Sequence, residues 1–154
     1  MYLTMDTTNF NKDYLILSDK IKNNILNNSD FYRMYYSTPN ITFNGIFLDF
    51  ELTNINIEQY FNKIKCCFTM NDNNKKSINQ ILELEKKILK HSGIFNKSSI
   101  YRIEEQLQNN FIKIFDDKNT KIGMYKKKKF ILKISGIWAN QSNEYGLTFR
   151  FFIY

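Results

Sequence analysis

The strongest constraint on the fold is the alternation of side chains from Phe130 to the C-terminus. Apolar residues recur at every second position on both sides of a polar turn over 140–143. The apolar set is Phe130, Leu132, Ile134, Leu147, Phe149 and Phe151, and the polar set is Lys133, Ser135, Thr148 and Arg150. This pattern predicts a β-hairpin with one packed face and one cationic face. Gly136 and Gly146 lie inside the strands, where glycine is typical of a bulge, a kink or a close approach.

The length and composition indicate one folded domain. The chain has 154 residues, of which 43% are hydrophobic and 16% are aromatic. Such a chain has enough apolar side chains to form a core, and it is too short for two domains of ordinary size. We therefore expect a single domain over residues 1–154, with residues 1–11 as a loose leader.

The chain is strongly basic, with a net charge of +7 at pH 7 and an isoelectric point near 9.3. This charge attracts polyanions, because phosphates that bind cationic side chains release their counterions. Nucleic acid is the first partner that the charge predicts, and an anionic membrane surface is the second. Abundant Asn, Lys, Ile, Phe and Tyr are also typical of an AT-rich genome, so a basic protein without a polyanionic partner is the alternative.

The sequence offers neither a disulfide framework nor a Cys/His metal site. Its two cysteines, Cys66 and Cys67, are adjacent, so a strand would point their side chains to opposite faces. His91 is the single histidine and falls at the expected end of a helix. Free cysteines are typical of a reducing compartment, and we expect a cytoplasmic protein without a cofactor. No apolar run is long enough to span a membrane, and the N-terminus lacks a signal-peptide pattern.

Periodicity predicts the remaining elements. Extended segments are expected over 31–37, 41–52, 64–70 and 111–115, and helices over 13–28, 77–92 and 98–107. The helix over 77–92 has the clearest pattern, because Ser77 and Gln80 form a capping-box pair and Gly93 follows its last turn. Its apolar stripe indicates a structural role.

These elements predict a mainly β protein with helices, in the α+β class. We interpret them as a five-stranded OB-type barrel with a helical insertion between strands 3 and 4, closed by the C-terminal hairpin. An α+β sandwich would contain the same strands and helix, and periodicity does not separate the two folds.

No arrangement of residues indicates catalysis. The five glycines are scattered, and neither a glycine-rich phosphate loop nor a hydrolase or zinc-peptidase motif is present. The acidic pairs Glu104–Glu105 and Asp116–Asp117 lie in polar stretches, where solvated charge explains them better than a two-metal site. We expect a protein that is not an enzyme and that binds no metal.

Cations and aromatic rings occur together, as binding of single-stranded nucleic acid requires. In such proteins a cationic groove follows the phosphates while aromatic rings stack on the bases. The predicted phosphate contacts are Lys126, Lys127, Lys128, Lys129, Lys133, Arg150, Arg33 and Lys65. The predicted stacking residues are Trp138, Tyr125, Tyr35 and Phe47. The lysine run at 126–129 could instead solubilise a loop or protect an edge strand, and Trp138 could be half buried with its indole N–H bonded to the backbone.

A family resemblance rests on two segments of the C-terminal hairpin, KISGIW at 133–138 and YGLTFRF at 145–151. They resemble the closing hairpin of OB-fold single-stranded DNA-binding proteins from large DNA viruses. With its small size, charge and composition, the chain is also similar to proteins of this kind from the cytoplasmic linear (killer) plasmids of yeasts. The resemblance implies coating and protection of displaced strands during replication in the cytoplasm, beside replication proteins.

The C-terminal segment departs from the phage relatives, which carry an acidic tail that recruits partners. This chain instead ends in an aromatic sequence, Phe151–Tyr154. Exposed Phe152 and Tyr154 on a terminal strand would suit a contact between subunits of a homo-oligomer.

The leading prediction is therefore a sequence-tolerant single-stranded DNA-binding protein. An RNA-binding module is the first alternative, because OB folds bind both polymers and only contacts to the 2′-OH separate them. A structural or assembly protein of a virus or plasmid system, without nucleic-acid affinity, is the second.

Overall fold

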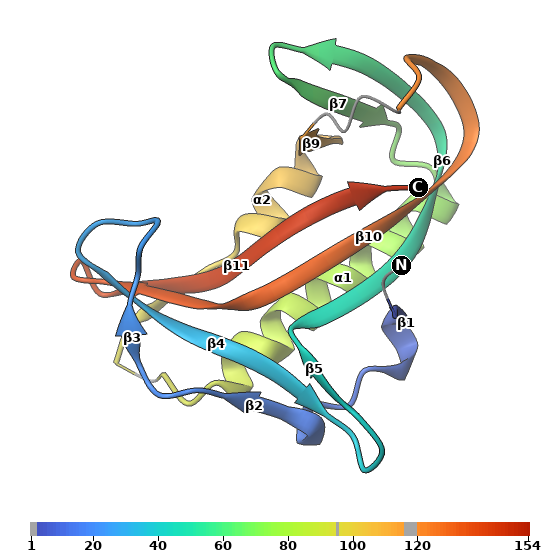
Figure 1. Cartoon of the computed structure of the whole chain (residues 1–154). Helices are drawn as coiled ribbons and strands as arrows, with labels where there is room; N and C mark the ends of the chain where they lie inside the picture. Colours follow the sequence, from blue (N-terminus) through green and yellow to red (C-terminus); the bar gives the residue numbers. More distant parts are fainter. Residues whose placement is uncertain (1–2, 95, 116–119) are drawn as a thin grey trace.

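The computed structural model describes residues 3–94, 96–115 and 120–154. Within these residues the chain forms a large open sheet of eleven strands with two α-helices and two short 3₁₀ helices (Figure 1). The strands are β1 (Met5–Asp6), β2 (Leu15–Leu17), β3 (Ile21–Lys22), β4 (Ser29–Ser37), β5 (Thr42–Asn44), β6 (Ile46–Tyr60), β7 (Lys63–Phe68), β8 (Ser98–Ile100), β9 (Phe111–Phe115), β10 (Gly123–Asn140) and β11 (Glu144–Ile153). The helices are η1 (Thr7–Asn9), η2 (Lys12–Tyr14), α1 (Asp72–His91) and α2 (Arg102–Gln108).

The long strand β10 organises the sheet. Its residues 123–134 pair with β6, its residues 136–140 pair with β4, and its residues 130–139 pair along the other edge with β11. The main path of the sheet is β2-β4-β10-β6-β7-β9. The ladders along this path are antiparallel, whereas β1–β6 and β8–β11 are parallel. Because β10 changes partner along its length, the sheet branches there.

Gly136 lies where β10 passes from β6 to β4. The β10–β11 register shifts between Ile134 and Gly136, which agrees with the bulge, kink or close approach predicted for a glycine at this position. The Phe31 ring crosses the backbone here, and a Cβ atom on Gly136 would collide with that ring and with the Tyr32 carbonyl oxygen. Only glycine lets the two strands and the ring approach this closely.

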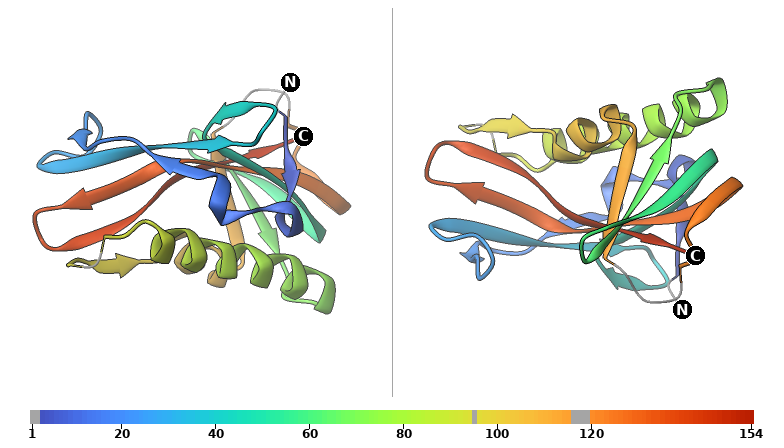
Figure 2. Two further views of the ribbon diagram at one scale, coloured as in Figure 1. Left: turned by 90° about the horizontal axis from the view of Figure 1, so that it is seen from below. Right: turned by 90° about the horizontal axis from the view of Figure 1, so that it is seen from above.

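Both helices lie against one side of the sheet (Figure 2). The buried stripe of α1 includes Ile78, Ile81 and Ile88, and it belongs to one core cluster with Leu48 of β6 and Ile134 of β10. Alternate residues of β4, β10 and β11 point into this core, so the side chains between them lie on the opposite face. That opposite face carries the polar and cationic residues of the C-terminal hairpin.

Asn74, in the first turn of α1, holds the bend of β6. It is fully buried, and Asn54 of β6 has a positive φ of 54° at the bend. The Asn74 Oδ1 atom accepts a hydrogen bond of 2.7 Å from the Thr53 backbone N–H, and its Nδ2 atom donates to the Thr53 carbonyl at 2.9 Å and to the Thr69 carbonyl at 2.8 Å. A single side chain thus satisfies backbone groups in two segments at the point where α1 joins the sheet.

The prediction of a five-stranded OB-type barrel is wrong, because the chain forms an open sheet of eleven strands. Side-chain alternation identifies the buried face of a strand, but it does not identify the neighbouring strand. The prediction therefore missed that β10 pairs with three strands. It also missed β1, β2 and β3, which add strands from the N-terminal part of the chain.

The N-terminal predictions need further correction. The helix predicted over 13–28 is wrong, because Leu15–Leu17 and Ile21–Lys22 pair with β4. The described part of the predicted loose leader is attached instead, since β1 pairs with β6 and the Thr7 hydroxyl donates to Gln80 Oε1 at 3.0 Å. Tertiary pairing here overrides a local apolar spacing that resembles a helix.

Other elements agree with the sequence more closely. The strands over 31–37 and 111–115 and the C-terminal hairpin are confirmed. The helix over 77–92 is confirmed, but it begins five residues earlier, and its N-cap is Asn71 rather than Ser77. The segment 98–107 divides into β8 and α2. Among the described helices, none is long and apolar enough to cross a membrane.

We expect Asn74→Ala to lower the free energy of unfolding by roughly 2–4 kcal/mol, because it leaves several buried backbone groups unpaired. Urea unfolding followed by circular dichroism would measure the loss. Asn73→Ala is the matched control, since Asn73 is exposed in the same helical turn and we expect a change of no more than about 0.5 kcal/mol. Equal stability of the two variants would contradict the role of Asn74.

Candidate nucleic-acid interface

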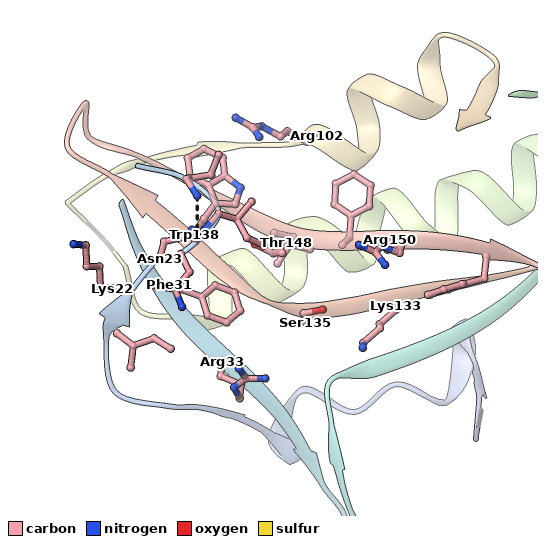
Figure 3. A pocket seen from close by; sticks show the side chains of 17 residues that line it. Lys22, Asn23, Phe31, Arg33, Arg102, Lys133, Ser135, Trp138, Thr148 and Arg150 are labelled. Carbon is pink, nitrogen blue, oxygen red and sulfur yellow. Dashed lines mark hydrogen bonds between the residues drawn. The ribbon is translucent and has the colours of Figure 1, made fainter. Parts of the chain in front are cut away.

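A groove of about 620 Å³ lies over β4, β10 and β11, bordered by the loop after β3 and by the start of α2 (Figure 3). Its cationic lining residues are Lys22, Arg33, Arg102, Lys133 and Arg150. Its aromatic lining residues are Phe31, Trp138, Phe149 and Phe152. None of the described residues that line it is acidic. The groove therefore combines an excess of positive charge with aromatic walls.

Three of these cations come from three neighbouring strands. Lys133 of β10 lies directly opposite Arg150 of β11, and Arg33 of β4 lies opposite Gly136 of β10. Figure 3 shows their side chains on the groove side of the sheet. Like charges directly opposite each other on adjacent strands destabilise the pairing. A bound anion would weaken the repulsion between Lys133 and Arg150.

We expect Lys133→Gln to raise the free energy of unfolding by a few tenths of a kcal/mol, up to about 1 kcal/mol, at low salt. The gain should shrink at high salt, because screening already weakens the repulsion between Lys133 and Arg150. Urea titrations at two salt concentrations measure this, with Lys126→Gln, an exposed position on the same strand, as the control. A loss of stability that does not depend on salt would contradict the repulsion.

Trp138 forms part of the groove wall but cannot stack on a base as predicted. Its side chain is only 2% exposed. One face of the indole lies over Gly146, where a Cβ atom would be 2.9 Å from the ring, and the Arg102 guanidinium lies 4.5 Å from the ring centre. The close approach predicted at Gly146 is confirmed. The indole Nε1 is buried and has no hydrogen-bond partner among the described residues, contrary to the backbone bond considered from the sequence.

Glu85 positions Arg102 through the start of α2. The N-cap residue of α2, Tyr101, makes no side-chain capping bond. Instead, the Glu85 carboxylate accepts hydrogen bonds of 3.0 Å and 2.9 Å from the backbone N–H groups of Ile103 and Glu104. A carboxylate is favourable at the positive end of a helix. Glu85 therefore fixes the helical turn from which Arg102 reaches Trp138.

Burial raises the pKa of Glu85 to about 7, although its two backbone hydrogen bonds act in the opposite direction. The folded protein then binds a proton more tightly than the unfolded chain, so stability should fall as pH rises from about 4.5 to about 7 and then level off. We expect a change on the order of 2–3 kcal/mol over this interval. Urea unfolding across the interval should show the slope, and Glu85→Gln should flatten it. A slope that persists in Glu85→Gln would contradict this assignment.

The accessible aromatic rings of the groove differ from those predicted. Phe31, Phe149 and Phe152 line it and are partly exposed. Phe31 lies opposite Trp138 in the β4–β10 register and packs over Gly136, with the Arg33 guanidinium 5.9 Å from its ring centre. Phe149 packs against the core, as predicted, and also lines the groove, whereas no role was predicted for Phe31. Phe31 and Tyr32 alternate, so one of them faces the core and the other faces the groove. The sequence could have placed Phe31 on the groove face only if the pairing of β4 with β10 had been known.

The lysine run 126–129 lies outside the groove. It belongs to the half of β10 that pairs with β6, and successive side chains of a strand point to opposite faces. Lys127 forms an ion pair with Glu51 at 3.2 Å, and the Lys128 ammonium lies 4.5 Å from the centre of the Tyr125 ring. The four lysines therefore do not form one continuous phosphate-binding surface.

The other predicted residues are also outside the groove lining. Lys65 is on β7, where it pairs with Glu58 at 3.8 Å. Tyr125 packs against the core, and its hydroxyl donates to the Lys121 carbonyl at 2.7 Å. Tyr35 is half buried on β4, beyond the segment that pairs with β10. Phe47 adjoins the groove, because it lies opposite Lys133, whose ammonium is 5.3 Å from its ring centre.

A turn after β3 forms the rim of the groove. The Asn23 Oδ1 atom accepts hydrogen bonds from the backbone N–H groups of Ile25 at 2.9 Å and Leu26 at 3.2 Å. This Asx-type turn keeps both apolar side chains on the rim, where they are exposed. The rim thus adds apolar surface beside the cationic floor.

Comparisons with known proteins give no relative for this arrangement. No protein-family model, no curated protein and no solved structure matches the chain. The functional interpretation therefore rests on the groove itself.

Proposed function

We propose that the protein binds single-stranded nucleic acid, DNA in the first place, with little sequence preference, through the groove over β4, β10 and β11. The observation that carries the proposal is the placement of Arg33, Lys133 and Arg150 on three neighbouring strands beside partly exposed aromatic rings. Single-strand binders combine these two features, because cations hold the phosphates while rings stack on the bases.

In this proposal the residues of the groove have separate tasks. Arg33 and Lys133 hold phosphates, with Arg150 beside them, since the three residues lie on neighbouring strands and line the same groove. Phe31 supplies the first stacking surface. Trp138 forms the wall under Arg102 and supports the groove from below without contacting the strand. Stacking accepts any base, which explains the expected sequence tolerance.

The cellular role belongs to the same proposal. The hairpin resemblance supports coating and protection of displaced strands during replication of a viral or plasmid genome. The free thiols of Cys66 and Cys67 suit a cytoplasmic protein. Because the sheet is open, an OB barrel does not support this role. Strand binding is supported by the charge and aromatic content of the groove, and the replication role by the hairpin resemblance.

We expect the double variant Arg33→Gln/Lys133→Gln to bind oligo-dT more weakly and with a smaller salt dependence. Loss of two phosphate contacts should reduce the slope of log affinity against log salt by about 1.4. Fluorescence anisotropy at several salt concentrations measures both quantities. Lys126→Gln/Lys129→Gln removes the same charge outside the groove. Its slope of log affinity against log salt should be closer to that of the wild type. Equal losses in both double variants would refute a groove-specific contact.

The same assay separates stacking from charge. Phe31→Leu keeps an apolar cover over Gly136 but removes the aromatic face, so we expect a loss of roughly 1–3 kcal/mol with the salt slope retained. Competition by RNA and by duplex DNA identifies the preferred polymer. Trp138 is the single tryptophan, and its emission should change when a ligand displaces Arg102. Absence of binding to any polymer would contradict the proposed function.

A further inference from the structure

A second cluster of rings and lysines lies on the outer face of β6, β7 and β9, away from the groove. Ile57, Ile64 and Ile112 of these strands point into the core, so the alternate residues point outward. The outward residues include Tyr60, Lys65, Phe111 and Lys113. We propose that this surface, the second platform, binds the same single strand as the groove. The inference rests on the function proposed above, and it extends the binding site along the nucleic acid.

The two lysines and the two rings form one group. The Lys65 ammonium lies 4.9 Å from the centre of the Phe111 ring and 5.8 Å from that of Tyr60. The Lys113 ammonium lies 4.8 Å from the Tyr60 ring and 5.3 Å from the Phe111 ring. Each ring is therefore flanked by two cations, the combination that a base and its neighbouring phosphates require.

The second platform repeats the electrostatic feature of the groove. Lys65 of β7 lies directly opposite Lys113 of β9, as Lys133 lies opposite Arg150. Glu58 pairs with Lys65 at 3.8 Å and offsets part of this repulsion. A like-charged pair weakens strand pairing in the free protein, and a phosphate between the two lysines would reverse that effect.

Phe61 is the most unusual residue of this surface. It lies in the two-residue turn between β6 and β7, since Tyr60 and Lys63 are partners across the ladder. It is 85% exposed and has a positive φ of 54°, a conformation that favours glycine in such turns. Its ring packs edge-on against Tyr60, with 5.0 Å between ring centres. The turn is less stable with phenylalanine than with glycine, so folding does not explain the residue, whereas contact with a ligand does.

Charge and shape favour a nucleic acid as the occupant. An apolar protein segment would leave the opposed ammonium groups of Lys65 and Lys113 desolvated without an anion. A single strand presents flat bases and phosphates in alternation, which fits rings interleaved with lysines. Because both surfaces carry the same two features, one strand that reaches from the groove to the platform satisfies both.

Oligo-dT of two lengths tests the second platform. We expect Phe61→Gly to leave the affinity for a strand of about 6 nucleotides unchanged and to weaken binding of a strand of about 24 nucleotides by about fivefold or more. Lys113→Gln should act on the same strand and reduce its salt slope by about 0.7. Both variants should have an unchanged or higher Tm, because each removes a locally unfavourable feature, and this excludes misfolding as the cause.

The groove variant Arg33→Gln/Lys133→Gln serves as the reference, since it should weaken binding of both lengths. If it does so while Phe61→Gly and Lys113→Gln bind the long strand like the wild type, the second platform is refuted and the groove retained. If the wild type binds neither length, the proposed function fails and the platform with it. Vesicles that contain anionic phosphatidylserine test the other source of phosphate. If Phe61→Gly abolishes vesicle binding but leaves binding of long oligo-dT unchanged, the second platform is overturned as a nucleic-acid site and the surface is assigned to membranes.

Discussion

The hydrogen bonds between Asn74 and Thr53 are the contact on which the arrangement of this fold depends. They join the first turn of α1 to β6 at its bend, where Asn54 has a positive φ and the buried positions change from even to odd numbers. Before the bend, β6 supports the part of β10 that leads into the groove. After it, β6 continues into β7 and the second platform. One buried amide therefore holds the bend between the part of β6 that pairs with β10 next to the groove and the part that continues into the second platform.

Positive charge is concentrated on strand pairs in a way that opposes folding. Lys133 faces Arg150 and Lys65 faces Lys113, although each position would be more stable with a neutral or acidic partner. A basic composition alone does not produce this register, because lysines can equally occupy loops or positions opposite carboxylates, as Lys129 does opposite Glu51. The opposed cations are therefore a stronger indication of an anionic ligand than the net charge.

The sequence predicted the local elements with strong patterns and failed where pairing partners decide the structure. The alternation in the hairpin identified Lys133 and Arg150 as outward residues, and the bulge at Gly136 followed from glycine inside a strand. Local patterns could neither establish nor exclude the barrel. The pairing partner of β10 changes from β6 to β4 along the strand, and no local sequence pattern indicates that change. Trp138 was misassigned for the same reason, since Gly146 and Arg102, which cover it, come from β11 and α2.

Several locally unfavourable features of the molecule lie at the groove or the second platform. Glu85 is buried, yet two backbone N–H groups satisfy it, and Asn74 makes a full set of hydrogen bonds. By contrast, the unpaired Trp138 Nε1 atom, the opposed cations and the positive φ of Phe61 lie at the groove or the second platform. A sequence shaped only for stability would remove them, because neutral side chains and glycine are available at these positions. The opposed cations and the exposed Phe61 ring at these two surfaces are explained if an anionic ligand with stacking bases binds there.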